Sequence, residues 1–244
     1  MKIGRSFGIL CLLACLSVLP AFAQDDYALF REEAGGASLL YRGQKAFVYN
    51  MLFNGTYYWS SPEFSRGEVR YNDNVYHDVL LNIDAVRQDL LVRQVAGIGE
   101  KVLTKELVEE CTFDGDRYLN LKFFYGEDAP EGYWKVLYDE GRAKMLVQVR
   151  KFLEQDVENR RRGETGYDGP YRLNVYQVFT YRVAYLYVTE SGDFVRIRRR
   201  SDLLRQFAGH DRRDIRRHVR HLDGAGFLSL DRYCIEALKY AESR

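Results

Sequence analysis

The sequence predicts an α+β fold: a predominantly antiparallel β-meander, arranged as a sandwich or partial barrel, followed by a C-terminal segment of two to three short helices. Three observations predict it. Apolar residues alternate with polar ones over much of residues 27–150, turn-forming dipeptides interrupt the alternation, and the apolar spacing becomes helical after Arg200. A period of two places alternate side chains on opposite faces of a strand, whereas a helical face needs a period of 3.6.

The first 23 residues have the pattern of a cleaved export signal. A basic start precedes an apolar run over residues 7–19, and Ala-Phe-Ala at 21–23 fits a cleavage site. The run is shorter than the ~20 residues of a membrane helix, so we expect no transmembrane segment. The sequence therefore predicts an exported protein, periplasmic or associated with the outer envelope. The alternative is a lipid anchor at Cys15, because Leu-Leu-Ala-Cys at 12–15 resembles a lipoprotein cleavage box.

Charge and cysteine content exclude several classes of protein. Loss of Lys2 and Arg5 with the signal changes the formal charge from +1 to −1, so net charge favours no particular partner. Only Cys111 and Cys234 then remain, and there is no C-x-x-C motif, which excludes a disulfide-dense scaffold and the usual zinc or redox motifs. The two thiols either pair in an oxidising compartment or stay buried and free. We predict no cofactor.

Two hairpins are predicted from their turn dipeptides. Residues 47–59 contain Asn54-Gly55, and residues 107–123 contain Asp114-Gly115. Both dipeptides tolerate the positive φ of a tight hairpin turn. In the second hairpin the alternation continues after the turn, so the return strand is expected to run through Phe123.

Residues 70–95 place several polar side chains in a segment that otherwise alternates. Apolar residues of one parity between Val75 and Ile83 form one face of a predicted strand. A connection over residues 85–88 leads to a second strand that begins at Asp89. Asp84 and Asp89 would then flank the turn, where carboxylates commonly accept backbone N–H bonds.

The rest of the β domain, predicted over residues 24–200, contains two more hairpins. Strands are expected at Tyr133–Tyr138 and Lys144–Phe152, joined by a turn at 139–141. Residues 155–172 are charged and rich in glycine, which predicts a mobile surface loop. Strands resume at Leu173 and end in a hairpin turned by residues 190–193.

The helical segment is predicted over residues 201–244, packed on the sheet. Ser201 is expected to cap a first helix that ends at Gly209, and Asp211 a second. Ser229 is expected to cap a third helix, in which apolar residues from Leu230 onward line one stripe.

Four segments in a fixed order carry a resemblance. They read NVYHDVLLNIDAVRQDLLVR, RYLNLKFF, EGYWKVLYDEGRAKMLVQVRKF and SDLLRQFAGHDRRDIRRHVRHL. They combine a strand that enters a turn at an Asp, a Gly-aromatic strand followed by Leu-Tyr-Asp-x-Gly, and a basic helix near the C-terminus. This order resembles a group of uncharacterised secreted proteins of the Bacteroidetes type, with two departures: Asn82-Ile83 stands where a tyrosine is expected before the Asp, and arginine stands where lysine is common. The resemblance implies export to the periplasm or outer envelope and assigns an activity to no residue.

The most specific candidates for a catalytic role are His77, Asp78 and Asp84. A general base needs a carboxylate or imidazole within hydrogen-bond reach of substrate, often oriented by a second group. Neighbouring residues of a strand point to opposite faces, however, and Asp84 is roughly 20 Å from Asp78 at about 3.3 Å per residue. We therefore expect strand and turn roles and predict no catalytic residue, with a hydrolase using Asp84 or His77 as an alternative.

The segment from Arg196 to Arg220 holds ten arginines and three aspartates. Such a segment suits an anionic partner, although a solvated helix face is the simpler interpretation. Export argues against nucleic acid, so the expected partners are a protein, a glycan or an anionic envelope component. His218 and His221 have metal-ligand spacing, but no further ligand completes a set and we predict no metal. The binding candidates in this segment are Arg212, Arg213, Arg216, Arg217 and Arg220.

Aromatic residues suggest a second binding surface. Trp59 and Trp134, together with Tyr57, could stack on sugar rings if they were exposed on one flat surface. Tyrosine-rich strands are also ordinary in antiparallel sheets, where rings cover neighbouring strands. No nucleophile elbow, P-loop or zincin motif is present. The sequence therefore favours a non-enzymatic envelope protein that binds or supports another component, with a glycan-binding module and the hydrolase as alternatives.

Overall fold

The structure, a computed structural model, describes residues 39–50, 53–94, 99–141, 143–159, 173–223 and 228–243. The chain divides into two compact units, Met1–Arg42 and Gly43–Arg244. In the first unit the described residues form the 3-10 helix η3 (Leu39–Tyr41). The predicted export signal and Cys15 lie outside the described residues.

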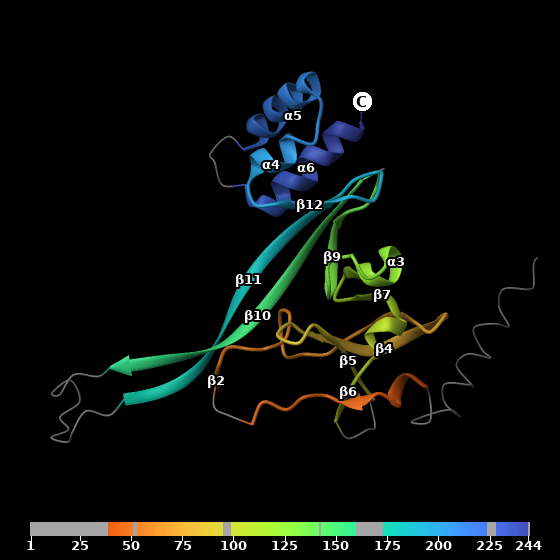
Figure 1. Ribbon diagram of the computed structural model, residues 1–244, viewed down its shortest axis with the longest axis vertical. Coiled ribbons are helices and arrows are strands. Elements are labelled where there is room, and N and C mark those ends of the chain that lie inside the picture. The colour runs from red at the N-terminus through yellow and green to blue at the C-terminus, as the bar shows by residue number, and fades with distance from the viewer. Residues whose placement is uncertain are drawn as a thin grey trace, which may run out of the picture. The chain divides into compact units, whose positions relative to one another are not determined.

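Twelve strands of the second unit form one sheet that is not closed (Figure 1). The order is β1-β6-β5-β4-β3-β7-β8-β9-β10-β11-β12, every neighbouring pair on this path is antiparallel, and β2 pairs in parallel with β11. The predicted sheet with short C-terminal helices is confirmed, whereas the sandwich or partial barrel stays a prediction. The strands are β1 (Gln44–Lys45), β2 (Phe53–Asn54), β3 (Ser65–Tyr71), β4 (Asn74–Asp84), β5 (Asp89–Arg93), β6 (Glu100–Val102), β7 (Val108–Phe113), β8 (Asp116–Asn120), β9 (Tyr133–Tyr138), β10 (Lys144–Asn159), β11 (Leu173–Val188) and β12 (Phe194–Ile197).

The helices of this unit are η4 (Lys105–Leu107), α3 (Leu121–Tyr125), α4 (Arg200–Leu204), α5 (Gly209–Leu222) and α6 (Leu230–Glu242). Among the described residues, every helix is too short or too polar to cross a membrane. The predicted cap of α6 is confirmed, because the Ser229 hydroxyl accepts the N–H of Arg232. The other two caps are wrong: Ser201 lies inside α4, and Asp211 lies in the first turn of α5.

One predicted hairpin forms and the other does not. Asp114 and Gly115 both have positive φ and turn β7 into β8. At the first site only Gly55 has positive φ, and β2 pairs with β11 rather than with its own neighbour. The physical reason is aromatic packing: the rings of Tyr49, Phe53 and Tyr57 gather around Phe179 of β11. A second correction concerns Leu121 and Phe123, which lie in α3 and not in a strand.

The polar segment forms β4 and β5 as predicted, with one irregularity. Gly67 pairs with Val79 and Val69 with Tyr76, so His77 and Asp78 together face Glu68 in a β-bulge. Asp78 has a φ of 57° at this bulge. The bulge re-aims the two side chains that strict alternation placed on opposite faces.

The strands β10 and β11 form the longest pairing of the sheet, from Lys144 opposite Val188 to Asn159 opposite Leu173. In Figure 1 they twist side by side over their whole length. The predicted loop at 155–172 is therefore too long, because residues 155–159 belong to β10. Its remaining residues up to 172 lie outside the described residues.

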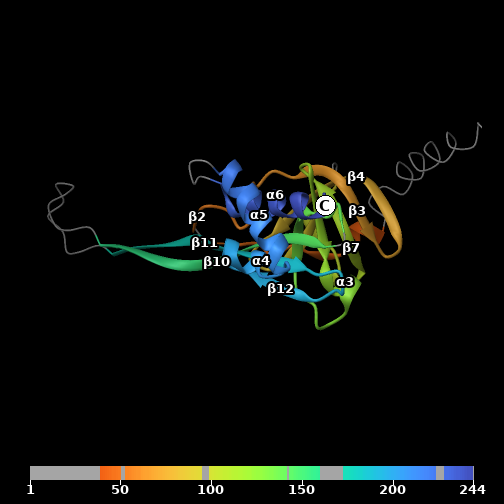
Figure 2. The same cartoon turned by 90° about the horizontal axis from the view of Figure 1, so that it is seen from above.

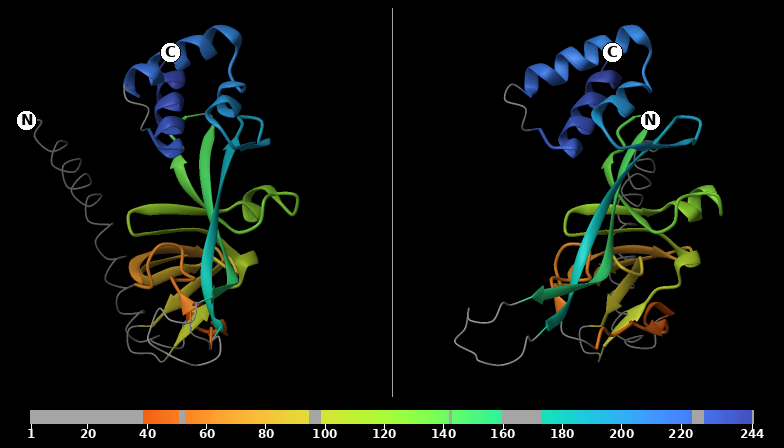
Figure 3. Two further views of the ribbon diagram at one scale, coloured as in Figure 1. Left: turned by 90° about the vertical axis from the view of Figure 1, so that its left-hand side faces the viewer. Right: turned by 60° about the vertical axis from the view of Figure 1, so that its left-hand side comes forward.

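Two apolar clusters pack on these strands. One joins the helices α4, α5 and α6 to β10, β11 and β12, with Met145, Tyr187, Ile197, Ile215 and Cys234 among its buried members. Figure 2 and both views of Figure 3 show the three helices together at the β12 end of the long strands. The other cluster includes Trp134, Leu146 and Leu186. The helices thus cover only one end of the hairpin.

Two buried side-chain amides, of Gln88 and Gln148, hold the backbone in place just before β9. The Gln88 side chain donates to the carbonyls of Ala85 and Val149 at 2.8 and 3.0 Å, and Gln148 donates to the Glu131 carbonyl at 2.8 Å and to Gln88 at 3.1 Å. Gly132 crosses directly over this pair with a φ of +92°. A Cβ atom there would lie 2.5 Å from Gln88 Oε1 and 2.6 Å from Gln148 Nε2.

Gly132→Ala should therefore lower the free energy of unfolding by about 2–5 kcal/mol, the sum of left-handed strain and crowding of the amide pair. Gly99→Ala is the matched control, because Gly99 has a φ of +89° but nothing within 4 Å of the added atom. Gly99→Ala should lower the free energy of unfolding only by the left-handed backbone strain, about 1–2 kcal/mol. Urea unfolding measures both, and equal losses would contradict the role given to the amide pair.

Candidate functional site

The register of β10 and β11 places two arginines face to face. Arg150 is directly opposite Arg182, and two positions earlier on β10 Gln148 is opposite Ala184. Alternate residues share a face of a strand, so these four side chains project from the same side of the sheet. Like charges directly opposite each other across strands are destabilising. The two guanidinium groups therefore form a local concentration of positive charge.

Two more arginines join them just before the helical segment. Arg196 lies on β12, opposite Leu186, and Arg198 follows the strand. A cavity of about 700 Å³ is lined by all four arginines together with Trp134, Gln148 and Phe152. We call Arg150, Arg182, Arg196 and Arg198 the arginine groove.

The charges of the arginine groove are not neutralised by the protein within the part of the chain that the structure describes. None of its four guanidinium groups makes an ion pair there, although arginines elsewhere do, such as Arg66 with Asp78 at 2.5 Å and Arg93 with Glu100 at 2.6 Å. Arg182 lies over the ring of Phe152, 4.9 Å from its centroid. Glu131 also lines the cavity, so the lining carries a net positive charge.

The five arginines predicted as binding candidates are distributed along α5. Arg212 donates to three carbonyl oxygens at the end of α4 and in the loop after it, which is a structural role. Arg213 and Arg217 lie near polar groups of α5 itself, at 3.5 and 3.9 Å. Arg216 and Arg220 line a separate cavity with the Arg200–Asp223 pair. The structure thus does not bring these five together.

The two tryptophans occupy different environments. Trp134 is 2% exposed and belongs to an apolar cluster, so it cannot form part of an exposed stacking surface with Trp59 and Tyr57. Its indole Nε1 is buried without a hydrogen-bond partner in the described residues. Trp59 is half-buried and packs edge-on against Tyr118, with ring centroids 5.3 Å apart. Trp134 therefore enters the site as a wall of the cavity beside the arginine groove.

The catalytic candidates do not converge. His77 is exposed and lies 2.6 Å from Glu68, and Asp78 pairs with an arginine at the bulge. Asp84 is 2% exposed at the far end of β4, where it accepts the N–H groups of Val86 and Arg87 at 2.8 and 3.0 Å. The predicted turn role of Asp84 is confirmed.

Asp84 also lies in a polar cluster that the sequence did not suggest. The Tyr49 hydroxyl donates to Asp84 at 3.0 Å, and the Lys151 ammonium donates to the backbone carbonyls of Thr56 and Tyr58. Burial raises the pKa of Asp84, against the opposing effect of its three hydrogen bonds, and burial lowers the pKa of Lys151. These groups fasten Tyr49 to the β4–β5 turn and Thr56 and Tyr58 to β10.

The histidines and cysteines are placed apart as well. His210 lies 3.8 Å from Asp214, and the ring of His218 stacks on Tyr240 with centroids 4.2 Å apart. Within the described ranges, no three His, Cys, Asp or Glu side chains come together as metal ligands. Cys111 and Cys234 are buried, free thiols, and burial raises the pKa of both.

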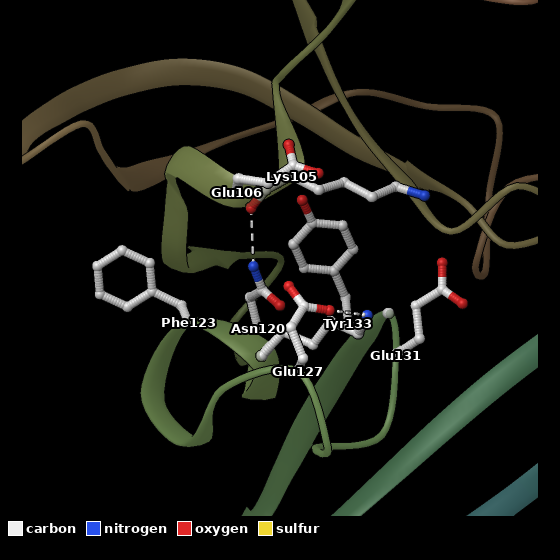
Figure 4. Close-up of a pocket in the computed structure, with 9 residues that line it drawn as sticks. Lys105, Glu106, Asn120, Phe123, Glu127, Glu131 and Tyr133 are labelled. Carbon is white, nitrogen blue, oxygen red and sulfur yellow. Dashed lines mark hydrogen bonds and ion pairs between the residues drawn. The ribbon is translucent and has the colours of Figure 1, made fainter.

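A further cavity, of about 310 Å³, lies beside Tyr133, the first residue of β9 (Figure 4). Tyr133 is 1% exposed, and its hydroxyl has no hydrogen-bond partner among the described residues. Figure 4 shows its ring between Lys105 and Glu106 on one side and Glu127 and Glu131 on the other. Successive residues of a strand face opposite ways, so Tyr133 and Trp134 place one unsatisfied polar atom on each face of the sheet.

The sequence interpretation missed Arg150 and Arg182. Both interrupt segments with predicted strand character, but neither forms part of an arginine run. Their juxtaposition depends on the strand register, which the alternation alone does not determine.

Asp84→Asn tests the cost of the buried carboxylate. Asparagine keeps an acceptor for the two backbone N–H groups and removes the charge. Because the pKa of Asp84 is raised in the folded state, its contribution to stability is present below the ordinary pKa and is lost as pH rises through the folded pKa. The variant should therefore gain stability relative to the parent between pH 3.5 and pH 7, as followed by urea unfolding at each pH. A relative loss over that range would mean that the charged form is the stabilising one.

Tyr133→Phe removes the unsatisfied hydroxyl and should raise the free energy of unfolding by about 1–3 kcal/mol, the usual desolvation cost of such a group. The matched control is Tyr185→Phe, because the Tyr185 hydroxyl donates to the carboxylate of Asp231. That change should lower stability by about 1.5–3 kcal/mol. Chemical denaturation of the two variants distinguishes the environments, and destabilisation by both would mean that the Tyr133 hydroxyl has a partner.

Comparison with known proteins gives no match to a family model, to a curated protein or to a solved structure. The function is therefore inferred from the residues of this chain.

Proposed function

We propose that this protein is a non-enzymatic, exported envelope protein that binds an anionic component through the arginine groove. The observation that carries the proposal is the direct opposition of Arg150 and Arg182 without an ion-pair partner in the described residues. An anion between them would replace repulsion with attraction on both sides. The export part rests on the N-terminal sequence pattern alone.

The chemistry of the arginine groove selects oxyanions. Guanidinium groups present N–H donors in a planar fork that matches carboxylate, phosphate and sulfate in bidentate geometry. Phe152 adds apolar surface beside the charges, and the cavity has the size of ordinary ligand sites. A ligand with one or more oxyanion groups and an apolar part fits this combination.

The double variant Arg150→Gln/Arg182→Gln should weaken binding of inorganic tripolyphosphate at least about tenfold, because each charge-assisted hydrogen bond contributes about 1.5–3 kcal/mol. Isothermal titration calorimetry at low and high salt measures the loss. Added salt should also weaken the binding of tripolyphosphate to the parent protein.

The matched control is Arg213→Gln/Arg217→Gln on α5, which removes the same charge from the predicted helix and should leave affinity nearly unchanged. If the α5 variant loses binding and the groove variant keeps it, the site belongs to the helix and the proposal fails.

A further inference from the structure

The outer edge of β11 is paired in two places and unpaired between them. β2 pairs with Gln177 and Val178, and β12 pairs with residues 185–188. No described strand pairs with Phe179–Ala184 on that side, although all six of these residues pair with β10 on the other. In Figure 1, β12 lies beside the upper part of β11 and β2 near its lower part. Every second residue of this interval directs its backbone N–H and C=O outward.

The interval is long enough for a strand of another molecule. Six residues of β-strand span about 20 Å at ~3.3 Å per residue. Exposed edges of this kind commonly pair with an additional strand, and natural proteins protect them with short length, charge or cover. In this protein the flanking strands β2 and β12 would define the two ends of the added segment.

The two faces beside the unpaired edge differ in chemistry. Arg182 projects toward the arginine groove, and Arg150 lies opposite it one strand further in. On the other face Tyr181 and Val183 are large apolar residues that are 67% and 42% exposed. A strand added to this edge would place alternate side chains over a cationic surface and over an apolar surface.

We propose that the arginine groove recognises an acidic peptide segment that adds to the edge of β11 as an extra strand between β2 and β12. The inference rests on the proposed function and names its ligand class. The segment carries acidic side chains at every second position, directed to the arginine groove, and apolar side chains between them, directed to Tyr181 and Val183. Main-chain hydrogen bonds supply affinity, and the alternation supplies specificity.

The probe is a synthetic peptide of about eight residues in which glutamate and valine alternate, long enough to fill the interval. Binding to the full chain is measured by fluorescence anisotropy. A peptide of the same composition, with the glutamates and valines in two blocks, should bind at least about tenfold more weakly, because only an alternating strand satisfies both faces.

Backbone methylation tests the strand itself. In an extended peptide the N–H groups of all the glutamates point to one edge and those of the valines to the other. Two further peptides carry N-methyl groups on the glutamates or on the valines. One of the two peptides should bind at least about tenfold more weakly, because its methyl groups block the main-chain hydrogen bonds to β11. The other peptide should keep its affinity.

The outcomes separate the two proposals. Unequal affinities of the two methylated peptides, together with loss of binding in the Arg150→Gln/Arg182→Gln variant, support the added strand. Equal affinities, whether retained or lost, overturn it, while tripolyphosphate binding that needs Arg150 and Arg182 leaves the anion function in place. If neither tripolyphosphate nor the alternating peptide binds, both proposals fail.

Discussion

The register of β10 on β11 is the constraint on which the rest of this structure depends. Sixteen consecutive pairs run from Lys144 opposite Val188 to Asn159 opposite Leu173. A shift of one residue would exchange the two faces of either strand. The apolar residues that receive the helices, such as Met145 and Tyr187, would then turn away from them. The same register that buries the helical cluster also places Arg150 opposite Arg182, so the stability of the fold maintains two like charges on directly paired residues.

The buried amide pair connects this hairpin to the remainder of the sheet. Gln148 belongs to β10, Gln88 to the turn before β5, and both meet at the backbone of residues 131–132 before β9. Buried amides are stabilising only when their donors and acceptors are satisfied. Here three separate segments supply the partners, which explains why an unusual backbone angle is retained at Gly132. Two of the three buried polar side-chain atoms that lack a hydrogen-bond partner among the described residues, on Tyr133 and Trp134, follow immediately after this restrained point.

Much of the architecture was predictable, and the reasons are local. The β4–β5 and β7–β8 hairpins follow from alternation and turn chemistry, because both signals lie within a few residues of each other. The segment around Asn54 was not predictable in this way, since its partner is Phe179, more than a hundred residues later, and aromatic packing outweighed the turn signal. The candidate site likewise combines a feature that is local in the sequence with one that depends on distant segments. An arginine-rich segment can be counted in the sequence, whereas the pairing of Arg150 with Arg182 arises only when two distant strands are aligned.

The strand order also bears on how the chain folds. β3 to β6 pair as neighbours in sequence, and so do β7 to β12, with the pairing of β3 to β7 as the connection between the two sets. Pairings between adjacent segments close short loops and form quickly, while distant ones carry a larger entropic cost. Each set can therefore assemble independently, and the β3–β7 seam and the attachment of β2 to β11 are the steps that join them. Val69 and Cys111 pair with each other across this seam, and each also pairs within its own set, with Tyr76 and Tyr118 respectively. Substitutions there would therefore act both on the joining of the two sets and on the set to which the residue belongs.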